Sequence, residues 1–227
     1  QACWRKAGLG CYNGQMNVTI VANGHVDEDF LPDIGSADLV IGVDRAAYWL
    51  LRHGVTPHVA IGDFDSTTRS QRAHIRKRVR DVRAFPSEKD ATDLELAIDH
   101  AISLKPKEVI IYGAIGSRFD HALVAVNLLE KLLQKNIEAK IRDKHNEVFL
   151  LQSRRTIFKS PRYKYLSLLP YTPKAVVTLR GVLYPVTKHI FHRDSSLGVG
   201  NEIREKEAEV IVHSGIVLLI QSRDGSK

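Results

Sequence analysis

The chain has 227 residues, of which 44% are hydrophobic and 26% charged, and its formal net charge is +7. This length accommodates one large domain or two modest ones, each with its own core. No stretch approaches the ~18 consecutive apolar residues of a membrane span. Two cysteines, Cys3 and Cys11, are too few for a disulfide framework or a Cys-rich zinc module. These features exclude a membrane-spanning protein and a disulfide scaffold, and we expect a cytoplasmic setting.

Residues 1–15 differ from the rest of the chain. They include Arg5 and Lys6 but lack the apolar region of a signal peptide, and the only methionine, Met16, directly precedes the apolar run 18–22. We therefore expect an expression leader or a disordered arm over 1–15. The basic excess of the chain suits an anionic ligand as well as simple solubility, so charge alone does not indicate nucleic acid.

Strand-like and helix-like segments alternate over residues 16–153. The predicted strands are short runs rich in Val and Ile, at 18–23, 39–44, 59–63, 109–113 and 139–142. Apolar residues at helical spacing lie between them, beginning at Ala46, Leu94 and Leu123, and Gly54 with Pro57 ends the first of these helices. This alternation predicts an N-terminal α/β domain, residues 16–153, with a mostly parallel sheet.

From Arg154 onward no helical period is evident, and short strand-like pieces alternate with turn signals. The pieces lie at 156–159, 165–169, 175–180, 210–213 and 216–221. This pattern predicts a smaller all-β domain over residues 154–227, a sandwich or barrel. Because so few residues bury a limited core, we expect it to pack on the first domain or on another subunit.

The segment 69–83 carries seven basic residues, which are Arg69, Arg72, Arg76, Lys77, Arg78, Arg80 and Arg83. No aromatic residues are interleaved with them for base stacking. A solvated helix flank is therefore favoured over a nucleic-acid surface, and no nucleic-acid partner is predicted.

Three loops that follow predicted strands concentrate the chemistry, and the first is 62–66. Residues two apart on an extended chain point the same way, so Asp63 and Asp65 can present two carboxylates to one point. Two oxygen ligands together with substrate phosphates suit Mg²⁺. The alternative is an Asp-rich turn in which Ser66 caps a helix.

The second loop is 89–95. Thr92 and Glu95 fit a capping box, and Asp93 suits the positive end of the helix dipole. Asp90 lies outside that box and, with Lys89, makes an acidic–basic pair that could meet a metal-bound phosphate.

The third loop, 113–121, opens the longest predicted helix. Its glycines, beginning with Gly113, let backbone N–H groups approach an anion at a helix N-terminus, and Arg118 can fork onto phosphate oxygens. It is neither a Walker A loop nor a full dinucleotide fingerprint, so a mere tight connection remains an alternative. His121 is a candidate proton carrier or a structural histidine.

Taken together, the three loops describe a Mg²⁺–nucleoside triphosphate site, because ligands collect beyond the carboxyl ends of strands in open α/β sheets. Nothing supports a nucleophilic triad. His189 and His192 have a loose metal-ligand spacing without a third ligand cluster, so zinc is set aside.

At these residues the sequence resembles the bacterial thiamine pyrophosphokinase family. The matching segments are 61–66, 89–95, 116–121 with Asn127, 181–185 and 196–202, and Asp44 matches a further acidic position. The resemblance extends from about Met16 to the C-terminus in the family's order. Where the family usually has Ser directly before Asn201, this chain has Gly200.

The resemblance implies an N-terminal α/β domain, a C-terminal β-sandwich and a homodimer with the site between subunits. It implies transfer of diphosphate from ATP to the thiamine hydroxyl, giving thiamine diphosphate and AMP. The thiamine loop would use Ser196, Gly198, Gly200 and Asn201.

On this hypothesis Mg²⁺ is assigned to Asp63, Asp65 and Asp90, and Asp93 completes the metal shell, orients the alcohol or caps its helix. ATP would be held by Arg118, oriented by Asp120, with Ser66, Lys89, Gly113 and His121 nearby, while Asp44 would bind water on the metal. Which carboxylate takes the hydroxyl proton depends on geometry. A pyrophosphokinase for another alcohol, such as a hydroxymethyl pterin, and a non-catalytic nucleotide-binding protein are the alternatives.

Overall fold

The structure, a computed structural model, describes residues 16–225, so the expected leader 1–15 lies outside the described residues. The chain forms two compact units that divide between Ala139 and Lys140. The domain boundary expected at residue 154 lies further along the chain, because residues 140–153 group with the second unit.

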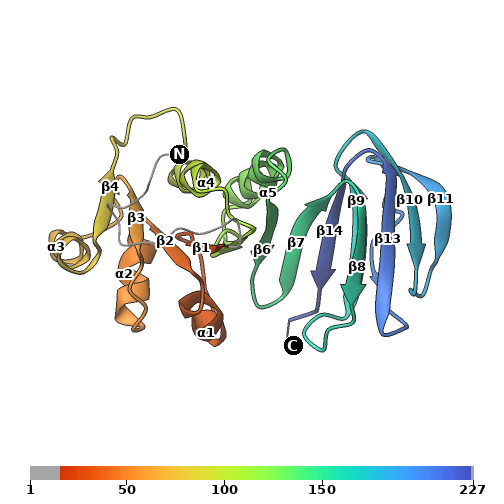
Figure 1. Ribbon diagram of the computed structural model, residues 1–227, viewed down its shortest axis with the longest axis horizontal. Coiled ribbons are helices and arrows are strands. Elements are labelled where there is room, and N and C mark those ends of the chain that lie inside the picture. Colours follow the sequence, from red (N-terminus) through yellow and green to blue (C-terminus); the bar gives the residue numbers. More distant parts are fainter. Residues whose placement is uncertain (1–15, 226–227) are drawn as a thin grey trace. The chain divides into compact units, whose positions relative to one another are not determined.

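The first unit is built on a parallel sheet (Figure 1). Its strands are β1 (Asn17–Val21), β2 (Leu39–Val43), β3 (Val59–Gly62), β4 (Asp81–Ala84) and β5 (Glu108–Tyr112). They lie in the order β5-β1-β2-β3-β4, and each neighbouring pair is parallel. Every residue of β2 and β3 is buried, as expected for strands covered on both faces. The predicted parallel α/β domain is confirmed.

Helices cover both faces of this sheet, as Figure 1 shows, with α4 and α5 on one side and α1 and α2 on the other. The helices are η1 (Glu28–Phe30), α1 (Leu31–Gly35), α2 (Arg45–Arg52), α3 (Arg69–Arg78), α4 (Asp93–Ser103) and α5 (Phe119–Leu133). In α2 the stripe of Ala46, Ala47 and Leu50 is buried, and the chain leaves the helix before Gly54, which has φ +79°. The three helices predicted from apolar spacing are confirmed as α2, α4 and α5.

The basic segment forms α3. Thr68 and Gln71 make a reciprocal capping box at its start, and Ile75 is its one fully buried residue. Four of its basic side chains are exposed, at Arg69, Arg76, Lys77 and Arg78. This agrees with the expected solvated helix flank.

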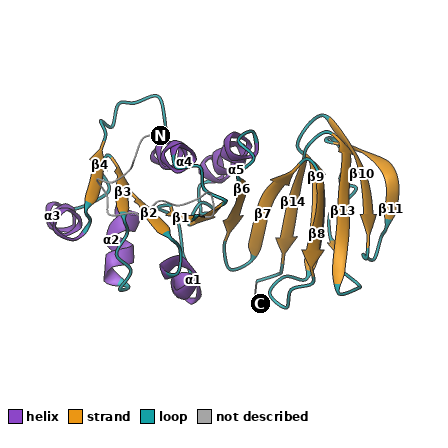
Figure 2. Cartoon of the chain, in the orientation of Figure 1, coloured by secondary structure: helices purple, strands orange, loops and turns teal. Residues whose placement is uncertain are grey.

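The second unit consists of antiparallel strands in two sheets, drawn as orange arrows in Figure 2. One sheet holds β7 (Asn146–Leu151), β9 (Tyr165–Pro170), β12 (Asn201–Glu202) and β14 (Val217–Ser222), with β6 (Glu138–Arg142) paired to β7. The other holds β8 (Arg154–Phe158), β10 (Lys174–Arg180), β11 (Val186–His192) and β13 (Glu207–Ser214). One apolar core joins them, including Leu168, Val177 and Val210. The predicted β-sandwich is confirmed.

Strands β4 and β11 carry no strong strand signal in the sequence. Strand β4 is half-buried at the edge of its sheet, and β11, at the edge of the other sheet, exposes most of its side chains. Between residues 16 and 225, none of the helices is both long enough and apolar enough to cross a membrane.

Candidate active site

The loops that follow the parallel strands of the first unit meet at one edge of the sheet, because parallel strands end on the same side. Asn23 follows β1, Asp44 follows β2, Asp63 follows β3 and Gly113 follows β5. The strand order changes direction between β1 and β5. Ligands of open α/β sheets bind at such a switch point, beyond the carboxyl ends of the strands.

Three carboxylates converge at this edge. Asp44, Asp63 and Asp93 each offer one oxygen, and these oxygens all lie within 4.8 Å of one another. They come from separate stretches of the chain, after β2, after β3 and at the first residue of α4. A set of carboxylate oxygens is the ligand type that Mg²⁺ prefers.

Asp44 occupies an unusual position in this cluster. It precedes α2 with φ +49°, a conformation that is uncommon for any residue except glycine, yet its side chain does not cap the helix. Its Oδ2 atom accepts hydrogen bonds from Ser66 Oγ and, at 3.2 Å, from Asn23 Nδ2. Its Oδ1 atom is buried and has no hydrogen-bond partner. An unsatisfied buried carboxylate oxygen beside two other carboxylates fits a cation site.

Burial raises the pKa of Asp44, and the neighbouring negative charges of Asp93 and Asp63 act in the same direction, while the hydrogen bonds from Ser66 and from the backbone of Arg45 oppose them. The opposite holds for Asp63, whose pKa is lowered, chiefly by the N–H of Asp65, which donates to Asp63 Oδ1 at 3.0 Å. The cluster therefore combines carboxylates with different proton affinities.

Lys89 supplies the positive charge within the cluster. Its Nζ atom lies 3.2 Å from Asp63 Oδ2 and 2.9 Å from Asp93 Oδ1, and all three side chains are largely shielded from solvent. Burial acts to lower the pKa of Lys89, but the bonds to Asp93 and Asp63 outweigh it and raise the pKa above its usual value. The predicted site residue Lys89 thus lies among the carboxylates.

Two expected metal ligands, Asp65 and Asp90, lie outside this group of three, and both side chains are exposed. The expectation for Asp65 depended on an extended chain, but Phe64 has φ +59° and a buried side chain, so Asp63 and Asp65 do not follow strand alternation. The turn is held from α3, where Arg72 Nη2 donates to the Phe64 carbonyl oxygen at 2.6 Å.

At the start of α4 only one of the two hydrogen bonds of a capping box is present. Thr92 Oγ1 accepts from the N–H of Glu95 at 3.2 Å, as the predicted capping box requires. The Glu95 carboxylate instead pairs with Lys131 at 3.0 Å. Thr92 performs the cap, which leaves the Asp93 carboxylate to face Lys89 and the acidic cluster.

The glycine-rich turn after β5 packs directly against the loop after β1. The N–H of Gly24 donates to the Gly113 carbonyl oxygen at 2.8 Å. A Cβ atom on Gly24 would lie 2.4 Å from that oxygen, and one on Gly113, at φ +67°, would lie 2.5 Å from the Ala22 oxygen. Backbone contact on both sides requires glycine at both positions.

Arg118 and Asp120 lie at the start of α5 and are exposed, as is His121. Arg118 forks onto Asp120 through Nη2 and, at 3.2 Å, through Nε. This bond lowers the pKa of Asp120 and raises that of Arg118. Both side chains of the pair are exposed to solvent, and the orienting role of Asp120 stays a prediction.

In the second unit the expected thiamine loop is shaped by backbone contacts. The carbonyl oxygen of Gly198 accepts from Leu168 N at 2.8 Å, and the N–H of Gly200 donates to Ser167 Oγ at 3.0 Å. Gly200 has φ +75° with open space beside it, whereas Ser196 is exposed. Asn201 is buried, accepts from the N–H groups of Tyr184 and Glu202 and donates to the Tyr184 carbonyl. Its amide therefore has a structural role.

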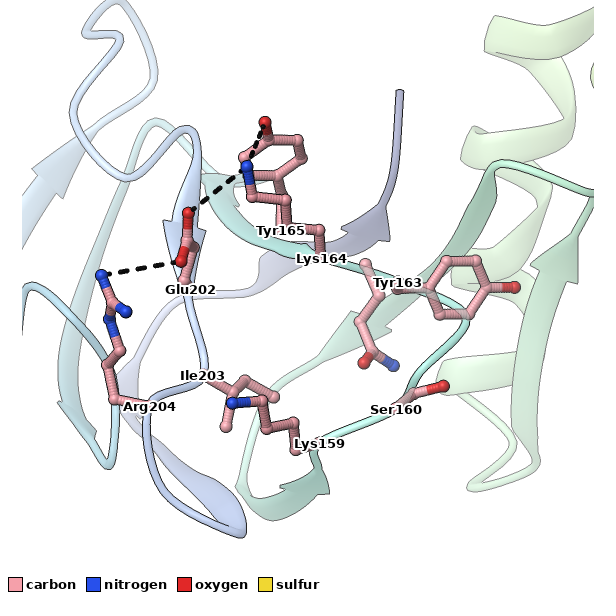
Figure 3. Close-up of a pocket in the computed structure, with 9 residues that line it drawn as sticks. Lys159, Ser160, Tyr163, Lys164, Tyr165, Glu202, Ile203 and Arg204 are labelled. Atoms are coloured by element: carbon pink, nitrogen blue, oxygen red, sulfur yellow. Dashed lines mark hydrogen bonds and ion pairs between the residues drawn. The ribbon is translucent and has the colours of Figure 1, made fainter. Parts of the chain in front are cut away.

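A hollow of about 200 Å³ lies elsewhere in the second unit, between the segments 159–165 and 202–204, and Figure 3 draws the residues that line it. Glu202 lies 3.9 Å from Lys164 and 3.7 Å from Arg204, so its carboxylate offsets two of the three cations at the rim. None of the expected thiamine-loop residues lines this hollow.

Asn23 is the site residue that sequence reasoning missed. It joins the loops after β1, β2 and β3, because its Nδ2 atom contacts both Asp44 Oδ2 and, at 3.3 Å, Ser66 Oγ. It belongs to no recognisable motif. The available signal was its place as the first polar residue after a buried strand, at the edge where ligands bind.

A cluster of carboxylates beside a glycine-rich turn and a helix N-terminus, on a parallel α/β sheet, is the arrangement that phosphoryl-transfer sites use. Residues 33–141 match the family described as "Thiamin pyrophosphokinase, catalytic domain", and residues 154–217 match "Thiamin pyrophosphokinase, vitamin B1 binding domain".

Individual relatives agree with these matches. The chain is 34% identical over 213 residues to the thiamine pyrophosphokinase of Bacillus subtilis (strain 168), covering 91% of this chain and 99% of that protein. The crystal structure of the Bacillus subtilis protein superimposes with a TM-score of 0.86, at 32% identity, over 92% of this chain and 100% of that one. That from Geobacillus thermodenitrificans gives 0.84, at 31% identity, over 93% and 99%. The chain belongs to the thiamine pyrophosphokinase family.

Proposed function

We propose that the protein is a thiamine diphosphokinase, which transfers the diphosphoryl group of ATP to the hydroxyl of thiamine and releases AMP. The observation that carries the proposal is the convergence of Asp44, Asp63 and Asp93 within 4.8 Å at the carboxyl edge of the sheet of a family member. Attack of an alcohol on a phosphorus shielded by anionic oxygens depends on positioning and charge neutralisation, which such an edge can supply.

Asp44, Asp63 and Asp93 are the residues that would hold Mg²⁺. When bound, Mg²⁺ neutralises charge on the ATP phosphate oxygens and orients them. Lys89 keeps the carboxylates from repelling one another, and its ammonium group is close enough to meet a phosphate that enters the cluster. Asp65 and Asp90 are exposed in the same two loops but stay outside this set of three ligands, so their part in the metal site remains a prediction.

The phosphates of ATP would lie against the turn that begins at Gly113, where backbone N–H groups and the start of α5 favour an anion. Arg118 would contact them with its guanidinium group and Asp120 would hold that group in place, as the present fork indicates. His121 and Ser66 line the same edge.

Thiamine would bind at the loop that contains Ser196, Gly198, Gly200 and Asn201, in the segment matched by the vitamin B1 binding description. Asn201 would contribute by shaping the loop, since its amide already bonds Tyr184 and Glu202. The open space beside Gly200 is where the family's usual serine would place its hydroxyl.

We further propose a homodimer with the site between subunits. Large apolar side chains of the second unit are exposed, at Phe158, Tyr184, Ile190, Leu197 and Val199. Apolar surface of this kind is typical of an association surface. Light scattering after size exclusion is expected to give twice the mass of the 25.5 kDa chain, and a monomer would contradict this part of the proposal.

The activity is tested by incubating the protein with ATP, Mg²⁺ and thiamine and identifying the products by mass spectrometry. We expect thiamine diphosphate and AMP in equal amounts. A parallel reaction with a hydroxymethyl pterin tests the neighbouring alternative. AMP formed only with the pterin, or no AMP with either acceptor, would overturn the proposal.

A further inference from the structure

The carboxylate of Asp44 is clamped from one side only. Ser66 Oγ and Asn23 Nδ2 both donate to Oδ2, while Oδ1 is buried without a hydrogen-bond partner. The two donors also contact each other at 3.3 Å. A carboxylate held by two donors on one oxygen cannot rotate freely, so the direction of its other oxygen is fixed.

This clamp is built from three loops that are distant in sequence. Asn23 follows β1, Asp44 follows β2 and Ser66 lies in the loop after β3. Asp44 itself stands in a left-handed backbone conformation and does not cap its own helix. Such a conformation persists only where the surroundings hold it in place, and it is often associated with function.

The side chains of Asn23 and Ser66 do little else. Both residues are exposed, and their side-chain hydrogen bonds run to Asp44 and to each other. Neither side chain fills the core, so packing does not explain the amide at position 23. Groups that orient a metal ligand from behind commonly change metal affinity tenfold to a hundredfold when removed.

We propose that Asn23 is a positioning residue, which together with Ser66 turns the Oδ1 atom of Asp44 toward the divalent cation. The inference rests on the proposed cation site and extends it to a residue outside every recognised motif. Asn23 acts through Asp44 and touches neither ATP nor thiamine in this role.

The test measures binding of Mn²⁺ alone, without nucleotide, by the electron paramagnetic resonance signal of the free ion. We expect the Mn²⁺ dissociation constant to rise about tenfold in Asn23→Ala and in Ser66→Ala. In the double variant the fold increase in the Mn²⁺ dissociation constant should be smaller than the product of the two single increases, because both side chains act on one oxygen.

Asn17→Ala and Ser70→Ala are matched controls. Asn17 is exposed at the opposite end of β1, and Ser70 is exposed in α3. Both controls should bind Mn²⁺ like the unaltered protein. Asn23→Leu, which keeps the branched side-chain shape but has no donor, serves if Asn23→Ala does not fold.

Unchanged Mn²⁺ binding in the folded Asn23 variant, with binding lost in Asp63→Asn, would overturn the inference. Failure of the proposed function is distinguishable, because a protein that makes no thiamine diphosphate can still show the Mn²⁺ effect. Where turnover is present, the Mg²⁺ concentration for half-maximal rate should rise in Asn23→Ala while the KM for thiamine stays unchanged. A purely structural role of Asn23 would not raise the Mg²⁺ requirement alone while leaving the KM for thiamine unchanged.

Discussion

The two units treat buried polar groups differently. In the first unit, Asp44 Oδ1 and Arg72 Nε are buried without hydrogen-bond partners. In the second unit, each buried polar side chain among the described residues has at least one partner, at Glu147, Ser167, Thr178, Asn201 and Gln221. Unsatisfied groups are rare in stable structure and need an explanation. In the first unit the unpaired oxygen of Asp44 lies within the carboxylate cluster, whereas in the second unit the buried amide of Asn201 fixes a loop.

The largest expected effect tests the first unit. Asp63→Asn should reduce turnover at least about a thousandfold, because a metal ion supplies several kcal/mol of transition-state stabilisation. The melting temperature should stay within a few degrees, since the substitution preserves shape. Steady-state AMP release and calorimetry measure the two quantities. Asp38→Asn, at the opposite edge of the sheet beside Asn17, is the control and should keep full activity. Normal turnover in Asp63→Asn would remove the cation site from the mechanism.

A second substitution separates phosphate contact from folding. Arg118→Ala should lower kcat/KM for ATP roughly a hundredfold to a thousandfold, the usual effect of losing one transition-state donor. Its side chain is 69% exposed, so stability should be unaffected. Arg118→Lys should recover only part of the rate, because an ammonium group cannot fork onto two oxygens. Wild-type kcat/KM in Arg118→Ala, with Arg76→Ala as the surface control, would contradict the phosphate role.

In the second unit, substitution of the buried polar residue Asn201 should lower the free energy of unfolding. Asn201→Ala removes three hydrogen bonds and leaves the Tyr184 and Glu202 groups without their partner, so the free energy of unfolding should fall by about 3 kcal/mol. Asn201→Asp keeps the acceptor and should lose about a third of that. Urea denaturation measures both. If Asn201→Ala instead raised the KM for thiamine at unchanged stability, the contrast between the units would fail.

The smallest effect is a difference in pH response. Burial, with the charge of Arg83, lowers the pKa of His100 to about 4, so its contribution to stability is present above 6.5 and is lost as pH falls toward 4. Burial raises the pKa of Tyr163 to about 12, so its contribution is present below 10 and is lost as pH rises toward 12.

Urea denaturation across pH checks this response. In a Trp4→Phe background, Trp49 fluorescence reports the first unit, which contains His100, and Tyr163→Phe should flatten only the alkaline loss. Equal alkaline losses in Tyr163→Phe and the unaltered chain would contradict the assignment.

Much of the fold follows from sequence because its strands are of two recognisable kinds. Continuous apolar runs such as β2 indicate burial on both faces. From Arg154 onward the helical spacing of apolar residues gives way to short strand-like runs between turn residues, which indicates the sandwich. Strands β4 and β11 escape this reasoning, because a sheet edge tolerates polar and irregular sequence. The family resemblance stated from the loop motifs is confirmed by the family matches.

The site is less predictable, because its geometry depends on backbone conformations that composition does not reveal. The left-handed residue Phe64 separates Asp63 from Asp65, and the left-handed Asp44 brings its carboxylate to the cluster. The cap formed by Thr92 could be read from spacing, but the release of Glu95 to Lys131 depends on a contact with another helix. Asn23 carries no motif at all.

The interlocking of Gly24 with Gly113 has a consequence for how the sequence can evolve. Neither position has room for even one methyl group, because each would meet a carbonyl oxygen of the opposing loop. Neither glycine can therefore be replaced unless the backbone of the opposing loop moves away. The contact also fixes the spacing of the two loops in the chain itself, so on the proposed function less conformational entropy would be lost when a nucleotide binds there.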